Sequence, residues 1–286
     1  MAIFECNDAL VKYLKDLGFN LVQFPRPNIA PLQILYKVKK GEVGLADSNL
    51  DQLVASELSL PEIKANIQVP QIENGTSDAF NLKAGFSLFK NFVSALNKFA
   101  GGNASAKPAP LLDNIYKDSD QAKFAYNNCL VDQISLVDLD NYLLKSKLKN
   151  KKGFFADKAK SGEIYIITSV LKSNNFIVEM QEQSEGRLNS SLEQLKTQVE
   201  ADLDVQMVSG EKESMSFSGP AHLIFGFKAV KLMGFEEEDH LTFSLAGDLI
   251  ARRGEEEAPQ EEDIEKLSEA LVEDQNFLNL HMGDPA

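Results

Sequence analysis

Two segments of this chain alternate between apolar and polar residues with a period of two, and this pattern most narrows the possible folds. Every second position is apolar in residues 63–69 and again in residues 80–88. Because successive side chains of a β-strand point to opposite faces, both segments are predicted as strands with one apolar face. The turn-rich stretch 73–77 between them predicts that they form a hairpin.

The rest of the body mixes short helices and strands without regular alternation. Helical spacing predicts a first helix that ends at Gly18, a short helix over 137–148 and another over 188–199. Residues 163–171 and 176–180 are predicted as a hairpin around the polar stretch 172–175. The pattern indicates an α+β fold: a twisted, mainly antiparallel sheet with surrounding helices, closed by a C-terminal helical tail.

Charge divides the chain into a body and a tail. Residues 236–286 contain 16 acidic and 3 basic residues, which is −13 of the total charge of −14. We therefore predict a body domain over 1–245 and a linker with a regulatory segment over 246–286. The tail has an apolar stripe at helical spacing, which predicts an amphipathic helix that docks on the body. Its members are Ile264, Leu267, Leu271, Phe277 and Leu278.

The residues that usually carry catalysis or metal binding are sparse. The chain has 2 cysteines and 3 histidines, which are scattered, and it shows no nucleotide-binding or nucleophile motif. We expect no enzyme activity, metal or cofactor. The acidic balance argues against a nucleic-acid partner. No apolar run reaches the length of a membrane-spanning helix and no leader is evident, so we expect a cytoplasmic protein.

The alternating segments have two interpretations. They are half-buried strands of a soluble sheet, which is the commoner case, or strands that line a transmembrane β-barrel. The candidate membrane-facing residues are Ile63, Ile67, Val69, Phe80, Leu82, Phe86 and Leu88.

Cys6 and the linker have two interpretations each. Cys6 is either a buried apolar residue or, beside Ile3 and Phe4, an acceptor for a palmitoyl chain. The linker is either a solvated charge run or a protease site. Its candidate cleavage region contains Asp248, Leu249, Arg252 and Arg253.

Two terminal patterns of the body carry a family resemblance. Residues 13–26, YLKDLGFNLVQFPR, are followed by IAPLQIL at 29–35, and residues 217–232 read FSGPAHLIFGFKAVKL. These patterns, in this order and with a short segment after them, resemble the bacterial gasdermins.

The resemblance implies a pore-forming protein that is monomeric while its C-terminal segment inhibits it. A caspase-like or trypsin-like protease would remove that segment. The body would then assemble in the inner membrane as a large homo-oligomeric β-barrel, bind membrane lipid and kill the cell as an anti-phage defence. Cys6 matches the cysteine that is palmitoylated in the family. The alternatives are a soluble interaction module whose acidic tail binds a basic partner protein, and an enzyme with an unrecognised site.

Overall fold

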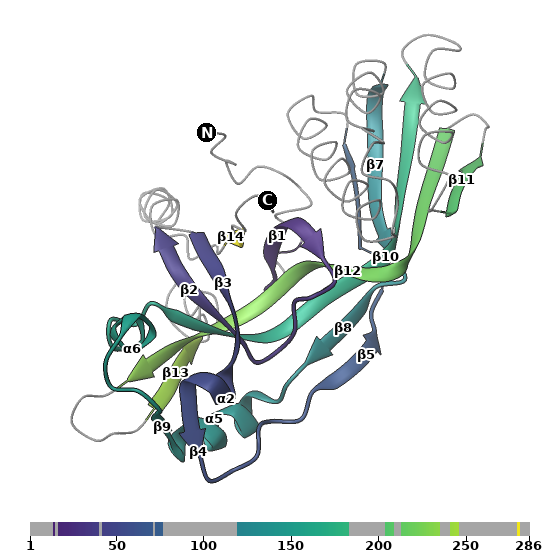
Figure 1. Cartoon of the computed structure of the whole chain (residues 1–286). Helices are drawn as coiled ribbons and strands as arrows, with labels where there is room; N and C mark the ends of the chain where they lie inside the picture. Colours follow the sequence, from purple (N-terminus) through teal and green to yellow (C-terminus); the bar gives the residue numbers. More distant parts are fainter. Residues whose placement is uncertain are drawn as a thin grey trace, which may run out of the picture. The chain divides into compact units, whose positions relative to one another are not determined.

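The chain divides into two compact units, and each is assembled from separated segments (Figure 1). The computed structural model describes residues 14, 17–39, 42–70, 72–76, 119–182, 204–208, 213–234, 241–245 and 279–280. Unit 1 contains 1–30, 64–133 and 170–227, and unit 2 contains 31–63, 134–169 and 228–286. Each unit is therefore made of residues far apart in the sequence.

Unit 1 is built from antiparallel strands. Pairs form between β6 and β7, β7 and β10, β5 and β8, β11 and β12, and β1 and β12. The strands that lie wholly in it are β1 (Asn20–Arg26), β5 (Lys64–Gln68), β6 (Ile72–Thr76), β7 (Ser119–Asn127), β8 (Leu130–Gln133) and β11 (Asp204–Val208). Two longer strands belong to both units along their length, and they are β10 (Ile164–Glu182) and β12 (Glu213–Gly234).

Unit 2 combines strands with short helices. β2 pairs antiparallel with β3 and with β10, β12 pairs with β13, and β4 pairs with β9. Its elements are β2 (Gln33–Lys39), β3 (Glu42–Asn49), α2 (Leu50–Leu53), β4 (Val54–Ser56), α5 (Leu136–Leu144), β9 (Ser146–Leu148), α6 (Phe154–Lys160), β13 (Leu241–Leu245) and β14 (Asn279–Leu280). The strand β14 pairs parallel with β3.

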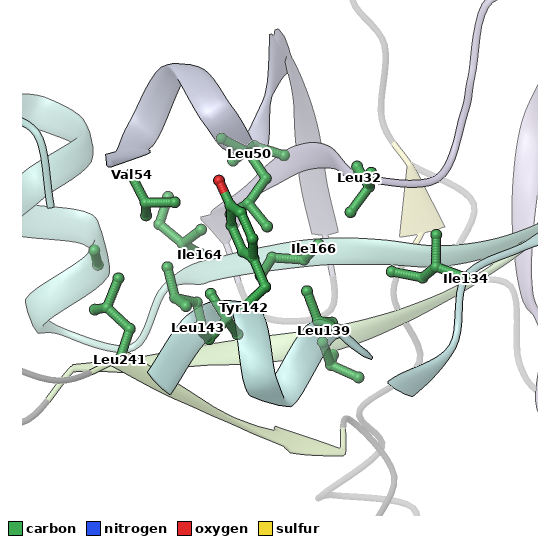
Figure 2. Close-up of a cluster of buried hydrophobic side chains, with 14 residues drawn as sticks. Leu32, Leu50, Val54, Ile134, Leu139, Tyr142, Leu143, Ile164, Ile166 and Leu241 are labelled. Carbon is green, nitrogen blue, oxygen red and sulfur yellow. The ribbon is translucent and has the colours of Figure 1, made fainter. Parts of the chain in front are cut away.

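The core of unit 2 is an apolar cluster that includes one face of α5 (Figure 2). Ser135 begins this helix, because its side chain accepts a hydrogen bond from the Asp138 N–H. Leu139, Tyr142 and Leu143 lie on the buried face of α5, as expected for positions three to four residues apart. Figure 2 shows the Tyr142 side chain directed from α5 toward the side of the cluster that holds Leu50. Burial of this stripe fixes α5 in unit 2.

The first predicted boundary is confirmed at Gly18. This residue has a φ of 75°, and the Phe19 N–H donates to the Leu14 carbonyl over 2.8 Å. A positive φ is readily adopted by glycine just past a helix end, where it lets the following N–H reach back to the last turn. Gly18 therefore directs the chain into β1.

Three of the predicted local structures are wrong. Residues 163–180 are not a hairpin, because β10 is one continuous strand of 19 residues. The predicted turn at 73–77 is largely the strand β6, which pairs with β7. The helix predicted to end at 148 ends at Leu144 and is followed by β9. The α+β class and the mainly antiparallel sheet are confirmed.

Candidate membrane strands and regulatory surfaces

An aromatic stack joins three strands of unit 1. The rings of Tyr126 and Phe225 are stacked, with centroids 3.8 Å apart and an interplanar angle of 6°. Phe176 meets the Tyr126 ring edge-on at 4.7 Å. All three side chains are buried, so β7, β10 and β12 are tied by contacts that combine apolar burial with favourable ring geometry.

A buried polar network lies next to the stack. The Asn175 side-chain amide donates to the Ser216 hydroxyl over 2.8 Å and to the Ser218 hydroxyl over 2.6 Å. Ser173 accepts a hydrogen bond from the Asn175 N–H, and its hydroxyl lies within bonding distance of the Asn127 carbonyl. Buried polar groups are costly without partners, so these contacts favour one arrangement of the strands. They also explain why the polar stretch 172–175 does not form a turn.

An ion pair extends the network to β8 and β5. Lys172 Nζ lies 2.5 Å from Asp132 Oδ2, and Asp132 Oδ1 accepts the Asn66 N–H over 2.7 Å. Burial lowers the pKa of His222 below 6.5, the Lys172 charge lowers it further, and Asp132 partly opposes both. The site therefore favours a neutral imidazole beside a charged pair.

The first predicted membrane strand is β5, and its apolar face is accessible. Ile63 is 39% exposed and Ile67 is 37% exposed, while Val69 is half-buried. The Ile63 and Ile67 side chains are therefore partly covered and partly accessible in the intact protein. β5 pairs on one side with β8, and its side chains remain at the surface.

The second predicted membrane strand lies outside the described residues, as do Phe80, Leu82, Phe86 and Leu88. The strands on either side of it are described. β6 and β7 are antiparallel, with Thr76 opposite Ala122. β6 ends at Thr76 and β7 begins at Ser119, so the residues on either side of 77–118 belong to adjacent strands. β10 ends at Glu182 and β11 begins at Asp204, on either side of residues 183–203.

The other predicted site residues also fall outside the described part of the chain. These are Cys6, the cleavage region with Asp248, Leu249, Arg252 and Arg253, and the stripe with Ile264, Leu267, Leu271, Phe277 and Leu278. Cys129 is described. Its side chain is buried, with 2% exposed, and its thiol contacts the Tyr126 carbonyl at 3.2 Å.

The tail pairs with the body through the short strand β14. In the β14–β3 pair, Asn279 lies opposite Glu42 and Leu280 lies opposite Val43. Val43 is fully buried. The predicted amphipathic helix precedes this strand, so the tail is attached to unit 2 by backbone pairing just after its apolar stripe.

Sequence reasoning missed a lysine-rich segment in unit 2. Residues 145–160 contain seven lysines and one acidic residue, Asp157. The acidic average of the whole chain obscured this local run, which a short charge window along the sequence would have found. The segment also forms one wall of a cavity of about 260 Å³, to which Lys152, Phe154 and Phe155 contribute.

Among the described residues, no helix has both the length and the apolar character needed to cross a membrane.

Comparison with known proteins decides the family. The sequence model of the Bacterial Gasdermin Family matches residues 22–239. This chain belongs to that family. It is 30% identical over 246 residues to the gasdermin bGSDM of Gillisia limnaea, covering 85% of this chain and 87% of that relative. It is 23% identical over 227 residues to the gasdermin bGSDM of a Desulfuromonadales bacterium, covering 79% and 82%.

The fold agrees with a solved bacterial gasdermin. The structure from Bradyrhizobium tropiciagri matches with a TM-score of 0.52 at 14% identity, covering 84% of this chain and 91% of that one. At this identity the likeness establishes the fold alone. The predicted family resemblance is therefore confirmed, and the family is one of pore-forming proteins rather than enzymes.

Proposed function

We propose that this bacterial gasdermin is a pore-forming protein that its own C-terminal segment holds inactive until a protease removes it. The observation that carries this proposal is the pairing of β14 with β3, because it joins the tail to a strand of unit 2. Two paired residues are a small contact, and tethering makes a small contact sufficient while the chain is intact. After cleavage that advantage is lost and the segment can leave.

The pore itself would come from two segments of unit 1, residues 77–118 and 183–203. The segment 77–118 connects antiparallel partners, and its residues 80–88 alternate with a period of two. Strands of about 9–11 tilted residues can cross a bilayer, and only a closed barrel satisfies their backbone groups in lipid. The active form would therefore be a homo-oligomer, whereas the inhibited form would be a monomer.

Three further parts complete the proposal. A caspase-like or trypsin-like protease cuts between residues 245 and 257, most simply after Arg252 or Arg253. The intact protein is cytoplasmic, and the cut body enters the inner membrane, where the pore kills the cell as an anti-phage defence. A palmitoyl chain on Cys6 adds membrane affinity, at about 0.8 kcal/mol for each buried CH₂.

Dye release from liposomes tests the pore. A specific protease site placed within residues 246–257 allows the intact protein to be purified and then cut. Release only after cutting is expected. Release from the uncut protein would contradict inhibition by the tail, and no release in either form would favour the interaction module.

Charge on the lipid face tests which strand lines the pore. Leu82→Arg places a basic charge on the predicted apolar face, at about 2–4 kcal/mol in each subunit near the bilayer midplane. Phe86→Asp places an acidic charge there at a smaller cost in each subunit. Both should abolish release, whereas the matched Lys83→Ala on the polar face should keep it. Equal release from all three variants would contradict the assignment of residues 80–88.

Two cellular assays test the regulatory parts. Leu267→Glu combined with Leu271→Glu should make the uncut protein toxic, because the docked apolar stripe is lost. Cys6→Ala should remove a palmitate adduct from the intact mass and reduce killing by the cut protein. A harmless double variant would contradict the docking of the stripe, and full toxicity of Cys6→Ala would show that the lipid is dispensable.

A further inference from the structure

The lysine-rich segment forms an exposed basic surface on unit 2. It runs from the end of α5 through β9 to the end of α6, and its lysines are exposed except for Lys158, which is half-buried. Lys158 is paired with Glu163 over 2.5 Å. Among the described residues, no carboxylate forms an ion pair with Lys145, Lys149 or Lys152. The surface therefore carries positive charge without a described counter-charge on these three residues.

A cavity adjoins this surface. It is lined by residues 150 and 152–156 and, from β2, β3 and α2, by Ile34, Ala46 and Leu53 among others. The cavity is open to solvent and has a volume of about 260 Å³, and Phe154 in its lining is 56% exposed. This volume is enough for one aliphatic side chain. A segment that satisfies both features must carry acidic residues and an apolar residue close together.

The tail has that composition. Residues 255–265 contain seven acidic residues and no basic residue, and Ile264 lies within them. Of this part of the chain, the structure describes β13, which ends at Leu245, and β14, which begins at Asn279. The ten residues from Leu245 to Glu255 can span up to about 33–36 Å when extended.

The strand that precedes the tail contributes to the same core as the two helices that flank the lysine-rich segment. Leu241 of β13 belongs to the same apolar core as Leu143 of α5 and Ala159 of α6. These two helices are the elements at either end of the lysine-rich segment. The tail therefore starts from a strand that shares a core with both ends of the basic surface.

We propose that the acidic run 255–265 of the tail docks on the lysine-rich segment 145–160, with Ile264 in the adjoining cavity. The proposal rests on the inhibitory role given to the tail above and names the surface that the tail covers. Seven negative charges face a segment of net charge +6, so attraction between them is strong at low salt. Much of it is screened at about 1 M salt, where the Debye length is about 3 Å.

Lysine acetylation followed by mass spectrometry tests the covered surface. The full-length variant E255Q/E256Q/E257Q/E261Q removes four charges from the tail. Its matched control, E236Q/E237Q/E238Q/D239N, removes four charges from outside the proposed docking run. Acetylation of Lys149, Lys151 and Lys152, relative to exposed Lys64 of β5, should rise about threefold or more in the first variant at low salt. It should stay unchanged in the control.

Equal acetylation in the parent and the first variant would overturn the proposal. A carbodiimide, which joins a carboxylate to an amine that touches it, gives a second readout on the full chain. Cross-links from residues 255–265 to lysines 145–160 should form at low salt and be lost at about 1 M salt. Cross-links from this run only to lysines elsewhere would also overturn the proposal.

The cavity has its own test. Benzoylphenylalanine at position 154 should photo-cross-link to the peptide that contains Ile264, whereas the same probe at Leu144, which is 41% exposed, should not. A cross-link from position 154 to a different peptide would overturn the place given to Ile264. Dye release after cutting, without tail–lysine cross-links in the intact chain, would keep the proposed function and reject this surface. Tail–lysine cross-links without dye release after cutting would support this docking surface and reject the proposed pore function.

Discussion

Both units bury apolar side chains, but unit 1 also links its own strands by buried polar contacts. Unit 2 buries an apolar cluster around α5, to which residues of the sheet and both neighbouring helices contribute. Unit 1 joins β7, β10 and β12 with one aromatic stack, and it places beside them a network of serine and asparagine side chains and an ion pair. Apolar packing is non-directional, whereas hydrogen bonds need defined geometry. Unit 1 also buries apolar side chains, among them Val22, Leu171 and Leu223, so its polar contacts add a defined strand register to an apolar core.

The function proposed for the chain offers a reason for the polar contacts between the strands of unit 1. Strands that must later extend into a membrane have to keep one register in the intact protein and then release it. Polar contacts suit this requirement, because their hydrogen-bonding groups can find other partners when the strands move.

The largest effect is expected in the apolar core of unit 2. Leu143→Ala removes a fully buried side chain and should lower the free energy of unfolding by about 2–5 kcal/mol. Leu144→Ala, one residue along the same helix and 41% exposed, should change it by less than about 0.5 kcal/mol. Urea unfolding measures both. Similar losses in the two variants would show that α5 does not depend on its buried face.

The ion pair of unit 1 should give the next largest effect. Lys172→Met leaves the mostly buried Asp132 carboxylate without its cation and should cost about 2–3 kcal/mol. The double variant Lys172→Met with Asp132→Asn should lose less than the sum of the two single variants, because each single change leaves the other partner unpaired. Strictly additive losses in urea unfolding would mean that the two residues do not act as a pair.

A smaller effect is expected from the polar network. Asn175→Ala removes the amide that donates to Ser216 and Ser218 and should cost about 1–2 kcal/mol. Hydrogen exchange should rise in β11 and β12 more than in β2 and β3, because the network belongs to unit 1. An equal rise in hydrogen exchange in both pairs of strands would show that Asn175 does not fix the strand register locally.

The smallest effect is a dependence on pH. The pKa of His222 is lowered by burial and then by Lys172, so the folded protein favours the neutral ring relative to the unfolded chain. The unfolded state then binds more protons, and stability is retained above pH 6.5 and lost as the pH falls through the folded pKa. His222→Gln should flatten this part of the profile in urea unfolding. An unchanged slope below pH 6.5 would remove His222 as its source.

The sequence could predict features that depend on local pattern. Gly18 adopts the positive φ that the sequence predicts after the first helix, and β5 follows from strict alternation. The patterns at 13–35 and 217–232 were enough for the family. The lysine-rich segment was also present in the sequence, but the net charge of −14 directed attention to the tail.

Other features were decided only by the tertiary structure. The stretch 172–175 has the composition of a turn, yet Asn175 bonds to Ser216 and Ser218, which lie more than 40 residues away, and β10 continues through it. Residues 73–76 form β6 because β7 supplies their hydrogen bonds. Local preference is worth little beside a satisfied buried hydrogen bond, and partners distant in sequence cannot be read from the pattern itself. The family and the strands with a period of two could therefore be predicted from the sequence. The continuity of β10, the accessible face of β5 and the pairing of β14 with β3 depended on which strands pair in the tertiary structure.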